Sequence, residues 1–132
     1  KELFFSEDLN CTSCHSGFNF TDFEFYNIGL YQEYSDKGRW RVTEDEKDEG
    51  KFKVPTLRNI EITGPYMHDG SINSLEEVID FKMSGGVDHP LKSEKVRSFS
   101  LSESDKAALK EFLYSLTDKE FVKREEERRI KI

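Results

Sequence analysis

The feature that most constrains this chain is the run Cys11-Thr12-Ser13-Cys14-His15, which contains both of its cysteines. Two residues between the cysteines allow both sulfur atoms to lie on one side of a single turn, with the imidazole held next to them. This order is typical of covalent haem attachment, in which the thiols add to the porphyrin vinyl groups and the histidine binds the iron. The motif therefore predicts one c-type haem bound through Cys11, Cys14 and His15.

Other roles for a cysteine pair at this spacing find less support. Cysteines three positions apart close too short a loop to stabilise the chain as a disulfide. A thioredoxin-like redox pair or two ligands of a zinc site are the usual rivals, but no β-α-β pattern follows and no second ligand pair is present. A reduced, buried cysteine pair is the remaining alternative.

Composition fits a small domain that needs a cofactor in its core. The chain has 132 residues, of which 35% are hydrophobic and 36% charged, so one domain with a lean apolar centre is expected. Aromatic side chains gather around the cysteine motif, as expected where a flat apolar ligand is enclosed. They are Phe4, Phe5, Phe18, Phe20, Phe23, Phe25 and Tyr26.

Net charge and hydropathy exclude several classes of partner. The formal charge of -7 and the pI near 5.1 argue against nucleic acid, which needs clustered basic residues. No apolar run is long enough to cross a bilayer. The sequence opens with KELFF, without an initiator methionine or a signal sequence, so we expect a processed or truncated chain.

Helix signals are clearest in the second half of the chain. Ser74 and Glu77 form a capping box, and Gly85 follows as a C-terminal stop, which predicts a helix between them. A second helix is expected from Ser102, with Asp105 in its first turn. Its inward stripe is predicted to be Leu109, Phe112, Leu113 and Leu116.

The rest of the chain is less regular. Short helices are predicted over residues 2–9 and, starting from a proline, over residues 55–59. Residues 17–40 show no sustained periodicity and predict an ordered loop. Residues 44–49 predict a solvated turn, with a partner-binding patch as the alternative. The charged residues 119–132 predict a frayed helix or a segment that crosses to a partner.

A six-coordinate haem needs a second axial ligand, and several donors are available. The candidates are Met67, His68, Lys82, Met83 and His89. Methionine is a common core residue, and His68 beside Asp69 fits a supporting hydrogen-bonded role. Lys82 is on the apolar face of its helix, where an iron-bound neutral amine would avoid the cost of burying an ammonium, although its stem can also carry the charge to water. Donor chemistry alone favours Met83.

Two long segments, FKVPTLRN at residues 52–59 and TGPYMHDG at residues 63–70, resemble the C-terminal haem domain of the bacterial di-haem cytochrome c peroxidase and MauG family. Shorter matching segments are LFF at 3–5, FTD at 20–22, DKGR at 36–39 with VT at 42–43, and LEEV at 75–78 leading to GG at 85–86. The resemblance covers residues 2 to about 117. It implies a mostly α, cytochrome-c-like helical domain wrapped around one covalent haem with long ordered loops, over residues 1–117, followed by a charged tail over 118–132.

The resemblance also implies a role and partners. In complete members the C-terminal haem passes electrons to a second haem, in an N-terminal domain where peroxide reacts. We therefore expect an electron-transfer domain, whose partners are an N-terminal haem domain or partner chain and a small electron-donor protein. Covalent haem and the family imply export to the bacterial periplasm or cell surface.

Further site residues follow from the resemblance and, for Arg58 and His68, from their polar character beside the expected pocket. The family's calcium ion between the two domains implies a site at the backbone carbonyls of Thr63 and Pro65. The family's Met or Tyr iron ligand aligns with Lys82, so spacing favours Lys82, donor chemistry favours Met83, and an open or water-bound site is the third alternative. Arg58 and His68 are hypothesised to bind the haem propionates or to support the ligands.

One C-x-x-C-H motif does not make a di-haem peroxidase, so alternatives to an electron-relay domain stay open. The chain could be a stand-alone mono-haem carrier or a subunit of a larger redox complex. It could also be a single-haem enzyme with an iron that reacts with peroxide, in which Lys82 or His68 donates a proton.

Overall fold

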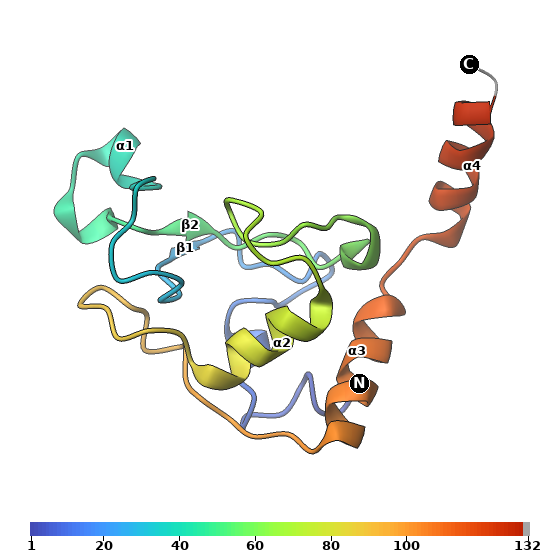
Figure 1. Ribbon diagram of the computed structural model, residues 1–132, viewed down its shortest axis with the longest axis horizontal. Coiled ribbons are helices and arrows are strands. Elements are labelled where there is room, and N and C mark those ends of the chain that lie inside the picture. Colours follow the sequence, from blue (N-terminus) through green and yellow to red (C-terminus); the bar gives the residue numbers. More distant parts are fainter. Residues whose placement is uncertain (131–132) are drawn as a thin grey trace.

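The computed structural model describes residues 1–130. Its helices are α1 (Trp40–Thr43), α2 (Leu75–Ser84), α3 (Glu103–Tyr114) and α4 (Lys119–Ile130), its strands are β1 (Phe25–Tyr26) and β2 (Phe52–Lys53), and its 3-10 turns are η1 (Cys11–Ser13), η2 (Glu46–Asp48) and η3 (Ile60–Ile62). Figure 1 shows the N-terminal segment beside α3, α2 and α3 side by side, and long irregular segments around them. The predicted helical character with long ordered loops is confirmed.

The predicted capping signals set the ends of α2 and α3. The Ser74 hydroxyl accepts a hydrogen bond from the Glu77 amide at 3.3 Å, and the Glu77 carboxylate accepts one from the Ser74 amide at 3.0 Å. Gly85 ends α2 in the left-handed conformation with φ of 77°. The Ser102 hydroxyl caps α3 by accepting from the Asp105 amide at 3.1 Å. Both helices thus begin where local chemistry requires.

A single apolar cluster joins the N-terminal segment to α2 and α3. Its buried members are Phe4, Leu9, Leu57, Leu75, Ile79, Leu109, Leu113 and Leu116. The predicted inward stripe of α3 is confirmed, because three of its four residues are buried and Phe112 packs against the cluster. Phe4 is only 2% exposed, and its ring lies 5.1 Å from that of Phe112. The N-terminal segment is therefore held against α3.

Both predicted short helices are wrong. Residues 2–9 form hydrogen-bonded turns, in which the Ser6 hydroxyl donates to the Leu3 carbonyl at 2.7 Å and competes with helical backbone hydrogen bonds. Residues 55–59 are irregular, and η3 begins only at Ile60. Here the Arg58 amide donates to the Thr56 hydroxyl at 3.1 Å and Asn59 has φ of 62°, so local side-chain bonding and a left-handed residue interrupt the helix.

The predicted loop over residues 17–40 is ordered around one buried amide. Asn27 is 0% exposed. Its side chain accepts from the Gly29 amide at 2.9 Å and from the Tyr34 hydroxyl at 3.1 Å, and it donates to the Glu49 carbonyl at 3.3 Å. The two-residue strands β1 and β2 pair antiparallel beside it. The charged residues 44–49 contain η2, which confirms the turn predicted there.

The charged tail forms the helix α4 as far as Ile130. None of its described residues is buried, and Figure 1 shows it projecting away from the rest of the molecule. Residues 131–132 lie outside the described part, and the domain boundary at 117 remains a prediction. Over residues 1–130, no helix combines the length and apolar character needed to span a membrane.

Replacing Ser74 with alanine removes the cap of α2. We expect the free energy of unfolding to fall by about 1 kcal/mol, because the Glu77 amide loses its acceptor. Chemical unfolding followed by circular dichroism measures the change. The matched control is Ser100→Ala, an exposed serine outside the helices. Equal stability of the two variants would contradict the role of the cap.

Candidate haem site

The cysteine motif forms one tight turn, as its spacing predicts. Asn10 precedes η1 in the left-handed conformation, with φ of 54°. The His15 amide then donates to the Cys11 carbonyl at 2.9 Å, and the Cys14 amide to the same carbonyl at 3.4 Å. Both thiols are free and half-buried, and Cys11 packs against the apolar cluster. Two sulfur atoms and an imidazole are thus held together at the edge of the core.

The two thiols lack the properties of a redox pair. Burial raises the pKa of Cys11 to about 11 and also raises the pKa of Cys14. Both pKa values are thus higher than those of redox-active cysteines, which are lowered to favour the thiolate. Within residues 1–130, no group of three or more His, Cys, Asp or Glu side chains is placed to hold a metal ion. These observations disfavour the disulfide-exchange and zinc alternatives.

The environment of His15 suits an iron ligand. Its Nδ1 lies 2.9 Å from the Phe20 carbonyl. Because a carbonyl only accepts, Nδ1 carries the proton, and Nε2 keeps a free lone pair for a metal. Burial is the main cause that lowers the pKa of His15, and the carbonyl groups of Phe20 and Pro55 oppose it by less. The imidazole is therefore neutral, as metal binding requires.

Arg58 lies against the loop that follows the motif. Its Nε and Nη2 donate to the Phe18 carbonyl at 3.0 and 2.7 Å. Its guanidinium stacks 4.6 Å from the Phe18 ring and 4.9 Å from the Phe20 ring. The sequence analysis proposed Arg58 as a propionate partner or a supporting group. In the structure its Nε and Nη2 bond the loop that also contacts His15, and a propionate contact remains a prediction.

Lys95 is a site residue that sequence reasoning missed. Its Nζ donates to the Ser13 carbonyl and to the Tyr26 hydroxyl, both at 2.8 Å. The Asn10 side chain donates to the Lys95 carbonyl at 2.8 Å. Lys95 therefore fastens the cysteine turn from the segment between α2 and α3. No local signal marks this lysine, because its partner is 82 residues away in the sequence.

Lys82 lies in the last turn of α2 and faces the motif. Its side chain is half-buried, and burial is the main cause that lowers its pKa, opposed by Cys14 and Cys11. Its charge in turn lowers the pKa of His15. Among the described residues its Nζ has no hydrogen bond or ion pair, and its one recorded contact is the Phe81 ring at 5.5 Å. Lys82 is thus a desolvated amine near the cysteines and His15.

Met83 has a different environment. Its side chain packs against the apolar cluster, and its carbonyl accepts from the Phe99 amide at 3.1 Å. These are the contacts of a core residue. Lys82 and Met83 thus differ in environment, although donor chemistry alone favours Met83, and the identity of the iron ligand remains a prediction.

Comparison with known proteins places this geometry in a family. No protein-family model matches the chain. It is 38% identical to methylamine utilization protein MauG of Methylorubrum extorquens, over 85% of the chain and 32% of the relative. It is 32% identical to cytochrome-c peroxidase IdrP1 of Denitromonas iodatirespirans, over 86% of the chain and 38% of the relative. The chain belongs to the di-haem cytochrome c peroxidase and MauG family.

Solved structures agree with this assignment. A MauG-like protein associated with microbial copper homeostasis superposes with a TM-score of 0.85 and 36% identity, over 89% of this chain and 45% of that one. A variant of the diheme peroxidase BthA from Burkholderia thailandensis shares the fold, with a TM-score of 0.73 at 22% identity. The chain spans about a third of the length of the two curated family members.

The histidines outside the family's C-x-x-C-H motif lie in a separate aromatic group. His68 stacks on Phe52 with ring centroids 3.7 Å apart, and Tyr34 lies 6.1 Å from His68. His89 lies 5.6 Å from the Tyr34 ring and pairs through Nδ1 with the Asn27 amide at 3.3 Å. None of the recorded contacts links this group to the cysteine motif, so a haem role for His68 remains a prediction. Met67, with φ of 71°, precedes it in the same turn.

The segment proposed for calcium in the family is a tight turn after η3. The Thr63 hydroxyl donates to the Ile60 carbonyl at 3.4 Å, and Pro65 follows a cis peptide bond. The nearby Asp69 is already engaged, because it accepts from the Tyr31 hydroxyl at 2.6 Å. A calcium role for the two backbone carbonyls stays a prediction.

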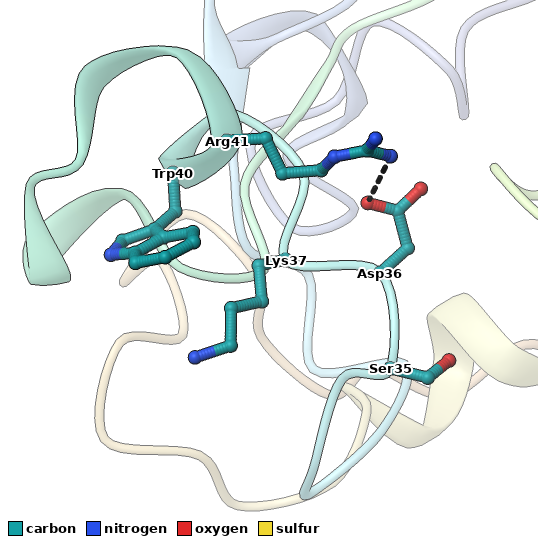
Figure 2. Close-up of a pocket in the computed structure, with 5 residues that line it drawn as sticks. All are labelled: Ser35, Asp36, Lys37, Trp40 and Arg41. Atoms are coloured by element: carbon teal, nitrogen blue, oxygen red, sulfur yellow. Dashed lines mark ion pairs between the residues drawn. The ribbon is translucent and has the colours of Figure 1, made fainter.

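A hollow of about 440 Å³ lies on the surface around α1, apart from the haem site. Its lining residues are Ser35, Asp36, Lys37, Trp40 and Arg41. Figure 2 shows Arg41 reaching toward Asp36, with which it forms an ion pair at 3.9 Å. Lys37 lies 4.6 Å from the centre of the Trp40 ring. Lys37 also forms an ion pair with Glu49 at 3.6 Å, so the charged groups of this hollow have partners, and none is a candidate haem ligand.

Asp69 gives the fold a pH-dependent contact. The Tyr31 hydroxyl holds the pKa of Asp69 at about 2, below its ordinary 3.8. Its contribution is therefore complete above about pH 4 and is lost as the pH falls through about 2. The carboxylate is exposed, so we expect a small effect. Asp69→Asn should show a smaller loss of stability between these pH values than the exposed control Asp88→Asn, in acid unfolding followed by fluorescence. Equal losses would contradict the assignment.

Proposed function

We propose that this chain is the c-type haem electron-transfer domain of a di-haem cytochrome c peroxidase or MauG-like protein. It corresponds to the C-terminal domain, and the second, catalytic haem lies outside this sequence. One observation carries the proposal: two protonated thiols, an imidazole with a free Nε2 and an unpaired amine converge beside one apolar cluster. Family membership gives that convergence its chemical meaning.

The residues present fit a haem. Cys11 and Cys14 would each add across a vinyl group, with the sulfur bonded to one carbon and the thiol hydrogen passing to the other, so no oxidant is needed. His15 would supply Nε2 to the iron, with its tautomer fixed by Phe20. The leucine and phenylalanine side chains of the cluster would cover the porphyrin and exclude water. When bound, the haem supplies one-electron transfer at its iron.

Lys82 is our proposed second axial ligand, ahead of Met83. An ammonium in this position has lost water without gaining an anion, which is costly. Deprotonation and binding to iron would remove that cost, whereas Met83 already has the contacts of a core side chain. This choice agrees with the spacing of the family motif. It leaves no open site for peroxide at this haem.

The proposed partners follow from charge and family. A chain with a net charge of -7 favours a basic or neutral electron donor. The N-terminal haem domain, on the same or another chain, would accept the electrons. Calcium at Thr63 and Pro65 would need further ligands from that domain or water. Covalent haem also favours a location in the bacterial periplasm or at the cell surface.

Covalent attachment can be tested on the purified chain. Intact mass should exceed that of the polypeptide by one haem, and Cys11→Ser or Cys14→Ser should each leave a single thioether with a shifted alkaline pyridine spectrum. Replacing both cysteines should abolish covalent haem. Ser13→Ala, inside the same turn, is the control and should keep normal attachment. A wild-type mass equal to the bare polypeptide would end the proposal.

The second axial ligand can be identified from the ferric spectrum. Lys82→Ala should convert the low-spin haem to a high-spin or water-bound form, because the amine donor is gone. Met83→Leu keeps the volume of the side chain and should leave the spectrum low-spin. The opposite result, a change only in Met83→Leu, would assign the ligand to Met83. Unchanged spectra in both variants would exclude each as the sole ligand.

A further inference from the structure

We infer that Arg58 and Thr56 are positioning residues for the proximal histidine. They act by holding the short segment between the cysteine motif and the buried Thr21. The last residue of that segment is Phe20, whose carbonyl accepts the hydrogen bond from His15. The inference rests on the proposed haem function, because it assigns His15 to the iron. It gives Arg58 a role on the proximal side of the haem, distinct from a propionate contact.

Three consecutive carbonyl groups in this segment each accept from a different side chain. The Phe18 carbonyl accepts from Arg58, the Asn19 carbonyl from the Thr56 hydroxyl at 2.6 Å, and the Phe20 carbonyl from His15 at 2.9 Å. The first two donors come from the same neighbouring segment, two residues apart. His15 is therefore bonded to a carbonyl whose two predecessors are fixed from outside the segment.

The backbone of this segment needs such support. Phe20 has φ of 53°, a left-handed conformation that is unfavourable for a residue other than glycine. That conformation accompanies the contact of the Phe20 carbonyl with His15. On the far side, Thr21 is anchored through its hydroxyl to the Val54 carbonyl at 2.7 Å. Loss of the Arg58 and Thr56 hydrogen bonds would let the backbone at Phe20 relax and move its carbonyl away from His15.

The shape of arginine matters at this position. One guanidinium edge gives two hydrogen bonds to one carbonyl while its flat face covers two aromatic rings. A lysine at residue 58 would keep the positive charge but lose the paired bonds and the stacking. Charge and positioning can therefore be separated by one substitution.

The bond from Nδ1 affects the iron through the imidazole. A carbonyl that accepts the Nδ1 proton makes the ring a stronger electron donor, which favours ferric iron and lowers the reduction potential. Weakening that bond should raise the potential. It should also expose the Nδ1 proton to exchange with solvent.

The experiment uses the haem-loaded chain with 15N-labelled histidine. Solvent exchange of the His15 Nδ1 proton is measured by NMR in the ferrous state, together with the midpoint potential. We expect about five- to tenfold faster exchange and a higher potential in Arg58→Ala, the size expected for loss of one hydrogen bond. Arg58→Lys should not restore either value. Thr56→Val, an exposed and nearly isosteric change, should shift both in the same direction.

The controls separate the possible outcomes. Arg41→Ala removes an exposed arginine of α1 and should change neither value. A lower potential with unchanged exchange in Arg58→Ala, restored by lysine, would show a purely electrostatic role, because loss of a nearby positive charge stabilises ferric iron, and would overturn the inference. Wild-type exchange and potential in both Arg58→Ala and Thr56→Val would also overturn it, while leaving the haem proposal intact. Failure of the wild-type chain to carry haem would overturn the proposed function and this inference together.

Discussion

The packing of the first residues against α3 is the interaction on which the rest of the structure depends. Only 35% of the chain is hydrophobic, so the apolar cluster has few members to spare. Phe4 contributes from the N-terminal segment and Leu113 from α3, and Cys11 packs against the same cluster. The cysteine turn is thus attached to the core itself. A haem bound there would complete the core that the sequence leaves small, so cofactor binding and folding would be coupled.

Outside that cluster, side chains hydrogen-bond to backbone groups that no regular helix or sheet pairs. Asn27 orders the loop over residues 17–40, Lys95 fastens the cysteine turn, and Arg58 holds the loop that follows it. Each satisfies amide or carbonyl groups that a helix or sheet would otherwise pair. Such contacts fix individual atoms in place, which a site for a rigid planar cofactor requires. Long irregular segments are therefore compatible with a well-defined ligand pocket.

Local signals explain what the sequence could predict. The ends of α2 and α3 followed from serine caps and a terminal glycine, and the cysteine turn followed from spacing within five residues. Arg58 and the Phe18 carbonyl are 40 residues apart, so no local pattern could reveal their contact. For Lys82 and Met83, spacing and donor chemistry favour different residues, and only their surroundings in three dimensions supply a further criterion.

A lysine in place of a methionine on the iron would change what the haem can do as a relay. Thioether sulfur stabilises ferrous iron and raises the reduction potential, whereas an amine is a stronger donor that favours the ferric state. Lys82 as ligand would therefore make this haem a stronger reductant for the haem that follows it. The carbonyl bond to His15 would act in the same direction. Under the proposed function, both Lys82 and His15 would thus favour electron transfer to the partner haem and disfavour uptake from the donor, so a strongly reducing donor is required.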